Sequence, residues 1–108
     1  MGFAPLSIPV EPNELAQQLH DRRFAYLITV TDNRSHVVAL VPEVNGAVLG
    51  FTTSGKTTRR DIDANSRVTI VWPPSESSEY SLIADGDATV HGDEVRVVVG
   101  RAVLHRPA

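Results

Sequence analysis

The chain of 108 residues contains no cysteine, a single lysine and no long apolar run. Without cysteine, disulfides, thiolate metal sites and cysteine nucleophiles are all excluded. No stretch approaches the roughly 20 apolar residues of a membrane span, and residues 1–10 lack the basic and apolar regions of a signal peptide. We therefore expect a soluble, cytoplasmic protein with no membrane partner.

The chain also lacks a large excess of charge of either sign, since its formal net charge is −3. Such a chain has no broad positive field, so bulk nucleic acid is not an expected partner. The hydrophobic fraction of 42% and the charged fraction of 21% are typical of a globular protein. The length suits one domain, which we expect to span residues 1–108 with 1–10 as an extended N-terminal arm.

β-Branched and aromatic residues dominate most of the chain after its first quarter. They form six candidate strands, at residues 24–31, 36–44, 47–53, 67–72, 80–91 and 94–105. Turn signals such as Asn45-Gly46 separate neighbouring runs, and Asn-Gly favours a tight hairpin because both residues tolerate positive φ. The pattern predicts a largely antiparallel sheet.

Helical patterns are short and few. Leu15 and Leu19 lie four residues apart in the segment 11–22, which predicts one short amphipathic helix. The segment 61–65 has one apolar residue and suits a helical turn over the mouth of a barrel. Six strands with so little helix must bury two apolar faces, and closing the sheet removes exposed edges. We therefore predict a small β-barrel.

Residues 50–57 spell G-x-x-x-x-G-K-T, the motif of a nucleotide-binding P-loop, and Lys56 is the lysine of the motif. A true P-loop joins a parallel strand to a long helix, and parallel strands need long crossover connections. Most of the chain after Thr57 has strand character instead. We interpret the match as coincidental and expect no ATP hydrolysis, while the same residues still suit a phosphate-binding loop of another kind.

Three motifs follow one another along the chain: His36-Val37-Val38-Ala39-Leu40, Gly50-Phe51-Thr52-Thr53-Ser54-Gly55-Lys56, and Ile62-Asp63-Ala64-Asn65-Ser66-Arg67-Val68-Thr69-Ile70-Val71-Trp72. Their order and spacing are similar to those of the FMN-binding split barrel, the family of pyridoxamine 5'-phosphate oxidases and their flavin- and deazaflavin-dependent relatives. The resemblance extends from about Leu15 to Arg106. It implies a mainly β, six-stranded, largely antiparallel split barrel with one or two short helices.

The same resemblance implies the positions of a cofactor site. In the family, a basic residue starting the second strand, a Thr or Ser ending the third, and a Ser-x-Lys step in the next loop hold the cofactor phosphate. Carried over, these roles fall on His36, on Thr52 and Thr53, and on Lys56 with Thr57 and Thr58. An ungapped alignment places the family's lysine on Thr58, so Arg59 or Arg60 would restore the charge. The ring system would lie against Val37, Val38 and Leu40, with Tyr80 and Ser81 near its other end.

The function implied is that of an oxidoreductase which uses FMN or the deazaflavin coenzyme F420 to transfer hydride to or from an unidentified small molecule. We also expect a homodimer with the cofactor in a cleft between subunits, because so small a barrel has little concave volume of its own and two-fold symmetry is the commonest arrangement of homo-oligomers. The cofactor would carry the chemistry, so no side chain is assigned a catalytic role. The alternative is a non-catalytic module that carries a flavin, a haem-type ligand or nothing.

Several residues have a plain structural interpretation. Thr52 and Thr53 are good strand formers, and Lys56 with its neighbouring arginines suits a solvated loop. Histidines His20, His91 and His105 are scattered, so we expect no metal site. Asp85 and Asp87 flank Gly86 within a strand and indicate a bulge. We expect Phe51 and Trp72 to be core or dimer-interface residues.

Overall fold

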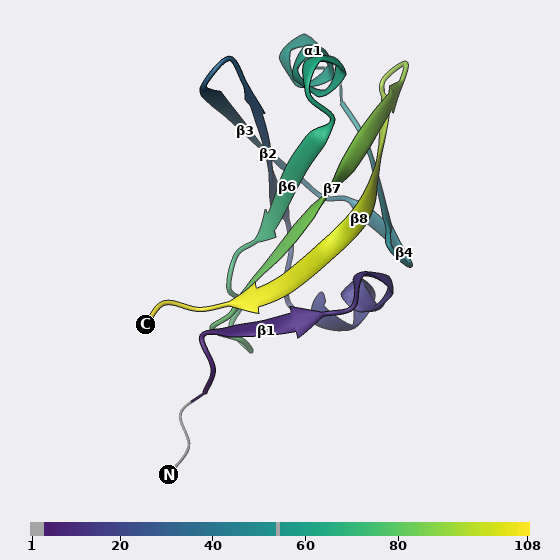
Figure 1. Cartoon of the computed structure of the whole chain (residues 1–108). Helices are drawn as coiled ribbons and strands as arrows, with labels where there is room; N and C mark the ends of the chain where they lie inside the picture. The colour runs from purple at the N-terminus through teal and green to yellow at the C-terminus, as the bar shows by residue number, and fades with distance from the viewer. Residues whose placement is uncertain (1–3, 54) are drawn as a thin grey trace.

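The computed structural model describes residues 4–53 and 55–108, and in these segments the chain forms eight strands and two helices (Figure 1). The elements in chain order are β1 (Ser7–Val10), η1 (Pro12–Gln18), β2 (Ala25–Thr31), β3 (Arg34–Leu40), β4 (Glu43–Asn45), β5 (Val48–Thr52), α1 (Lys56–Ala64), β6 (Arg67–Trp72), β7 (Ser81–His91) and β8 (Glu94–His105).

The strands form one antiparallel sheet in the order β3-β2-β6-β7-β8-β5-β4. β8 is its longest strand. One edge of β8 pairs with β7 along its length, while the other edge pairs first with β5 and then, from Ala102 to His105, with β1. The sheet curls without closing, because β3 and β4 end the order and do not pair with each other. This arrangement confirms the predicted antiparallel split barrel.

The predicted number of six strands is wrong, because the structure has eight. One extra strand is β1, which lies in the segment predicted as an extended arm and pairs with β8. The other arises because the predicted strand at 36–44 is interrupted after Leu40 and continues as β4 from Glu43. Pro42 explains the break, because proline has no N–H to donate to a neighbouring strand.

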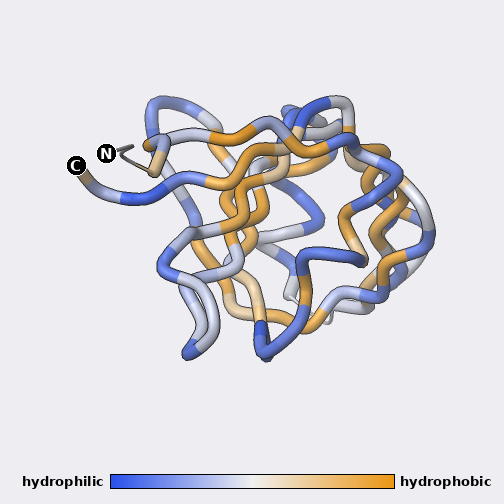
Figure 2. Tube along the Cα trace, turned by 90° about the horizontal axis from the view of Figure 1, so that it is seen from below, coloured by the Kyte–Doolittle hydropathy of each residue, from blue (hydrophilic) through white to orange (hydrophobic). Residues whose placement is uncertain are grey.

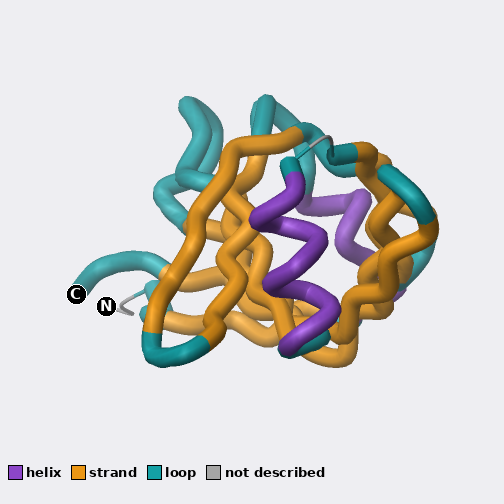
Figure 3. Tube along the Cα trace, turned by 90° about the horizontal axis from the view of Figure 1, so that it is seen from above, coloured by secondary structure: helices purple, strands orange, loops and turns teal. Residues whose placement is uncertain are grey.

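The helices also differ from their predicted bounds. The segment 11–22 forms only the 3-10 helix η1, which buries Leu15. The turn expected at 61–65 is the end of the nine-residue helix α1, which lies across one end of the barrel in Figure 3. The first half of α1 consists of threonines and charged residues, so the pattern of apolar residues did not indicate a helix there. Neither helix of the described segments is long and apolar enough to cross a membrane.

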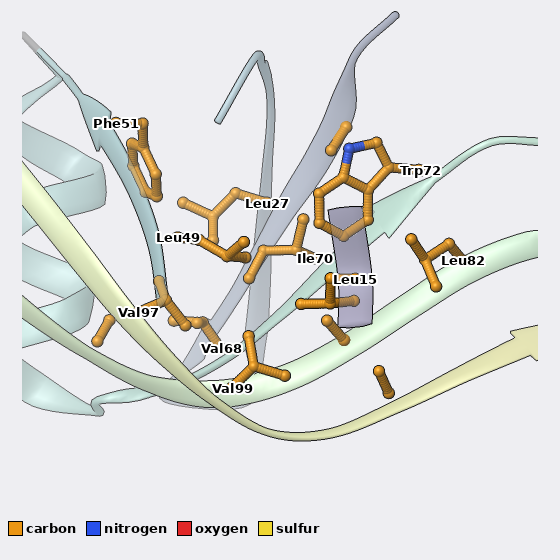
Figure 4. Packing of buried hydrophobic residues seen from close by; sticks show 14 of the residues in the cluster. Leu15, Leu27, Leu49, Phe51, Val68, Ile70, Trp72, Leu82, Val97 and Val99 are labelled. Carbon is orange, nitrogen blue, oxygen red and sulfur yellow. The ribbon is translucent and has the colours of Figure 1, made fainter. Parts of the chain in front are cut away.

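The core fills the inside of the barrel with alternate residues of the strands. Phe51 and Trp72 belong to it, as one of the two sequence interpretations expected (Figure 4). The largest aliphatic side chains with less than 2% exposure are Leu15, Leu27, Leu49, Ile70, Leu82, Val95 and Val97. Hydrophobic segments gather around this interior, and hydrophilic ones lie at the turns (Figure 2). Burial of these side chains is the main force that holds the barrel together.

The pairing of β7 with β8 shifts between Asp85 and Gly86, as expected of a bulge at this position, but the extra residue is Gly100 of β8, which has no partner in β7. A Cβ at Gly86 would lie 2.5 Å from the carbonyl oxygen of Val98, so only glycine permits the close approach of the two strands. The Thr69 hydroxyl donates to Oδ1 of Asp85 at 2.6 Å on the neighbouring strand. Asp85 therefore has a hydrogen-bond partner within the sheet.

Candidate functional site

The barrel is split along a seam between β3 and the end of β5. β3 is hydrogen-bonded to β2 only, and Phe51 and Thr52 of β5 extend past the short edge strand β4, so they are paired on the β8 side alone. A cavity of about 340 Å³ lies at this seam, and the start of α1 forms its third wall. We call it the seam cavity. Its lining residues are His36, Val38, Ala39, Leu40, Phe51, Thr52, Thr53, Gly55, Thr57 and Thr58.

Seven of the thirteen residues predicted to bind a cofactor line this cavity. They come from three elements: His36, Val38 and Leu40 from β3; Thr52 and Thr53 from the end of β5; Thr57 and Thr58 from the first turn of α1. The β3 residues alternate along the strand, so their side chains share the inner face. The fold thus brings together residues up to 22 positions apart in the sequence.

The other six predicted residues do not line the seam cavity. Val37 is 53% exposed on the opposite face of β3, and Lys56 is exposed on α1. Arg59 donates from Nη1 to the Gly92 carbonyl oxygen at 3.5 Å. Arg60 lines a second, adjoining cavity. The remaining two, Tyr80 and Ser81, are placed elsewhere in the barrel.

Ser81 is the first residue of β7 and pairs with His105 at the C-terminal end of β8, and Tyr80 directly precedes it. The Tyr80 hydroxyl donates to the Pro5 carbonyl oxygen at 2.7 Å. The Tyr80 carbonyl oxygen accepts from Nη1 of Arg22, also at 2.7 Å. Desolvation by burial lowers the pKa of Arg22. Within one chain these hydrogen bonds hold the segments of Pro5, Arg22 and Tyr80 together. A cofactor role for Tyr80 and Ser81 stays a prediction.

The start of α1 presents hydrogen-bond donors to the seam. Its N-cap, Gly55, has extended backbone angles and provides no side-chain cap. The first N–H groups of a helix have no partner within the helix and carry a partial positive charge. The Gly55 N–H itself donates to Oγ1 of Thr53 at 3.0 Å, which holds the loop end against β5. Backbone N–H groups and threonine hydroxyls therefore converge on one side of the cavity.

A buried carboxylate holds α1 in this position. Asp61 is 6% exposed, and its two oxygens accept from the hydroxyls of Thr29 at 3.1 Å and Thr31 at 3.3 Å on β2. Sequence reasoning missed this role. The available signal was helical spacing, because Thr58, Asp61 and Ile62 lie on one face of a helix and all three are buried.

A second cavity of about 460 Å³ adjoins the seam cavity, and we call it the arginine cavity. It lies between the β2–β3 turn and the side of α1. His36 and Thr57 line both cavities. The full lining is Thr31, Asp32, Arg34, Ser35, His36, Thr57, Arg60, Asp61 and Ala64. Arg34 was not among the predicted site residues, because only the folded β2–β3 turn brings it beside α1.

The charges of the two cavities differ. Of the residues that line the seam cavity, His36 is the only one with a titratable side chain. The arginine cavity is lined by two arginines, and also by Asp32 and Asp61. In residues 4–53 and 55–108, no group of three or more His, Asp or Glu side chains is placed to hold a metal ion.

The P-loop motif joins a strand to a helix, as in a true P-loop, but its strand lies in an antiparallel sheet. β5 leads through the motif into α1, as a strand leads into a helix in a P-loop. However, the two strands paired with β5 are antiparallel to it, and α1 has only nine residues. Ser54 of the motif lies outside the described residues. The parallel scaffold that a P-loop needs is therefore not the one found here.

Solved structures share this architecture. An FAD-binding protein from Mesorhizobium loti matches with a TM-score of 0.75 at 14% identity, over 96% of this chain and 100% of the other. A pyridoxamine 5'-phosphate oxidase-like protein from Listeria innocua matches with a TM-score of 0.67 at 12% identity, over 86% and 96%. An F420 reductase matches with a TM-score of 0.58 at 20% identity, over 85% and 92%. The fold is therefore the split barrel that the three motifs predicted.

Sequence relatives give the family itself. The Mycobacterium bovis protein Mb0449c and the Mycobacterium tuberculosis protein MT0457 are each 42% identical to this chain over 116 aligned positions, which cover 92% of this chain and 82% of each relative. Both are described as uncharacterized proteins. No protein-family model matches the chain. The chain belongs to the family of these two mycobacterial proteins, and it shares its fold with the solved split-barrel structures.

Proposed function

We propose that the protein is an oxidoreductase that binds a flavin-type cofactor, either a flavin or the deazaflavin F420, in the seam cavity. One observation carries the proposal. Seven residues assigned to cofactor binding from sequence motifs, on three separate elements, line a single cavity. The volume of about 340 Å³ lies at the lower end of the range of about 300–1,000 Å³ for ligand sites.

The chain's own groups divide into two parts. The hydroxyls of Thr52, Thr53 and Thr57 and the free N–H groups of α1 suit a phosphate, which needs several donors. Val38 and Leu40 suit the apolar face of a ring. Because β3 has a hydrogen-bonded partner on one side only, its unpaired backbone groups can meet the polar edge of that ring.

When bound, the cofactor would supply the hydride chemistry. The protein would bind the phosphate, orient the ring along β3 and exclude water from its inner face. His36 would place its imidazole ring on the phosphate side of the cavity. The small molecule that gives or takes the hydride would approach the ring from the open side of the seam.

We also propose that the protein acts as a homodimer. The outer face of β2 and β3 carries exposed apolar side chains, including Tyr26 (39%), Val30 (46%) and Val37 (53%). Phe24 packs edge to face on Tyr26, with ring centroids 5.2 Å apart. Large apolar patches on a monomer mark interaction surfaces. Since β3 forms both this face and one wall of the seam, a second copy seated here would lie next to the cavity.

A second candidate function is supported by one specific observation. The seam cavity has no lysine or arginine in its lining, and Lys56 lies outside it. Neutral donors hold a phosphate dianion less strongly than charge-assisted ones. A non-catalytic module that binds a flavin-like ring without a tightly held phosphate is therefore the alternative.

Titration with cofactors tests the proposal. We expect FMN, FAD or F420 to bind. Binding is measured by the quenching of the cofactor's fluorescence. Thr57→Val keeps the side-chain shape and removes a donor, so it should weaken binding, whereas the exposed Thr89→Val on β7 is the matched control. If riboflavin, which has no phosphate, binds as tightly as the phosphorylated cofactors, the non-catalytic alternative is favoured. If none of the cofactors binds, the proposal is wrong.

Three single variants then locate the cation at the phosphate. Loss of a charge-assisted hydrogen bond, at about 1.5–3 kcal/mol, should weaken binding about 10- to 150-fold. A loss confined to Lys56→Ala would assign the charge to the lysine of the motif. A loss of FMN affinity in Arg59→Ala and Arg60→Ala would assign it to the arginines instead. Catalysis is tested separately, by the bleaching of bound cofactor with reduced nicotinamide and its reoxidation by an added acceptor.

A further inference from the structure

The arginine cavity contains unpaired cationic groups. Within the described segments, the guanidinium groups of Arg34 and Arg60 take part in no ion pair or side-chain hydrogen bond. Each guanidinium has five N–H donors and stays charged at neutral pH. Arg34 comes from the start of β3 and Arg60 from the middle of α1, so two separate elements present them to one cavity.

The two carboxylates of this cavity do not form ion pairs with the arginines. Asp61 is buried, and both of its oxygens already accept hydroxyl hydrogen bonds from β2. Asp32 is exposed in the β2–β3 turn, where it has a φ of 49°. Neither carboxylate lies within 4.0 Å of an arginine nitrogen of the cavity. The free hydrogen-bonding capacity therefore consists mainly of donors, which suits an anionic group.

The arginine cavity continues the seam cavity. His36 and Thr57 form a common wall, so a phosphate held at Thr57 lies at the junction of the two. The neutral seam cavity suits the ring and its sugar-alcohol chain, and the arginine cavity begins where the first phosphate ends. A ligand that reaches both cavities needs a second anionic group beyond that phosphate.

On this basis, and resting on the proposed function, we propose that the arginine cavity is a subsite for a second anionic group of the same cofactor. The group is held by Arg34 and Arg60. The second phosphate of FAD and the carboxylates of the F420 tail both provide this chemistry, whereas FMN ends at its first phosphate. The chain accordingly prefers an extended flavin or deazaflavin over FMN.

Titration of the full-length protein with riboflavin, FMN, FAD and F420 tests this subsite, using the wild type, Arg34→Gln and Arg60→Gln. Both variants should lower the affinity for FAD or F420 about 5- to 20-fold and the affinity for FMN less than about 2-fold. We expect a small loss of affinity for a charge-assisted hydrogen bond, because both arginines are exposed and solvent screens their charge. The cofactor that shows this loss identifies the source of the second anion. Circular dichroism should show unchanged folding.

Arg101→Gln is the matched control, since Arg101 is exposed on β8 and lines neither cavity. It should leave all four affinities unchanged, and Arg60→Lys should restore part of the lost affinity. Equal losses for FMN and the extended cofactors would place the arginines at the first phosphate and overturn the second subsite. So would FMN affinity equal to that of FAD and F420 in all variants. Binding of no cofactor at all would overturn the proposed function, and this inference with it.

Discussion

Replacement of Asp61 by alanine should loosen the helix that forms one wall of the seam. Its carboxylate accepts two hydroxyl hydrogen bonds from β2, at 3.1 Å and 3.3 Å. Hydrogen bonds to a charged group are worth about 1.5–3 kcal/mol each, but the variant also removes the cost of burying a carboxylate. The Thr29 hydroxyl, in a residue only 1% exposed, would be left without its partner.

We expect Asp61→Ala to lower the free energy of unfolding by about 2 kcal/mol, because an orphaned buried hydroxyl adds to the lost bonds. In a domain of this size each kcal/mol lowers Tm by about 4–8 °C, so the loss should be roughly 8–16 °C. Urea and thermal unfolding followed by circular dichroism measure both quantities. Cofactor affinity should fall as well, since α1 carries Thr57 and Thr58.

Two comparisons isolate the interaction. Asp63→Ala changes an exposed carboxylate two positions away on the same helix and should shift stability by less than about 0.5 kcal/mol. Thr29→Val removes one of the two hydroxyls that donate to Asp61. The stability lost in the double variant with Asp61→Ala should be smaller than the sum of the two single losses, by at least about 0.5 kcal/mol. Additive effects, or an Asp61→Ala protein as stable as wild type, would refute the anchoring role of this carboxylate.

Three further outcomes are expected. Gly86→Ala should lower unfolding free energy in urea by about 2 kcal/mol or more, because its Cβ would lie 2.5 Å from the Val98 carbonyl oxygen; Gly50→Ala, with nothing within 4 Å, should change it little. Light scattering at micromolar concentration should give about twice 11.7 kDa, and Val37→Glu should shift the mass toward one chain; a wild-type mass near 11.7 kDa would exclude the dimer. Mg-ATP should be neither bound tightly nor hydrolysed, and turnover abolished in Lys56→Ala would contradict the antiparallel assignment of β5.

Most strands were predictable because β-branched residues and turn signals mark them locally. Residues Asp32 and Asn33 form the β2–β3 turn with positive φ, and Gly46 does so in the next hairpin. Helix α1 was underestimated because its first half has no apolar side chain, and only packing against the barrel reveals the buried face with Thr58. Local propensity does not carry that tertiary information.

The candidate site was predictable only in part. The threonines and His36 follow from motif order, and the fold gathers them at the seam. Arg34 and Asp61 escaped prediction because their roles depend on how α1 lies against β2 and β3, which is a long-range arrangement. The single lysine drew attention through its motif, yet in the structure it is exposed outside both cavities.

A crystal structure of the protein with a bound flavin or deazaflavin tests the central claim most directly. The account predicts the ring along β3 beside Val38 and Leu40, and the first phosphate within hydrogen-bonding distance of Thr57 at the start of α1. A ring outside the seam would contradict it. So would a phosphate more than about 6 Å from Thr57 and from the cationic groups of Lys56, Arg59 and Arg60, because no direct hydrogen bond spans that distance.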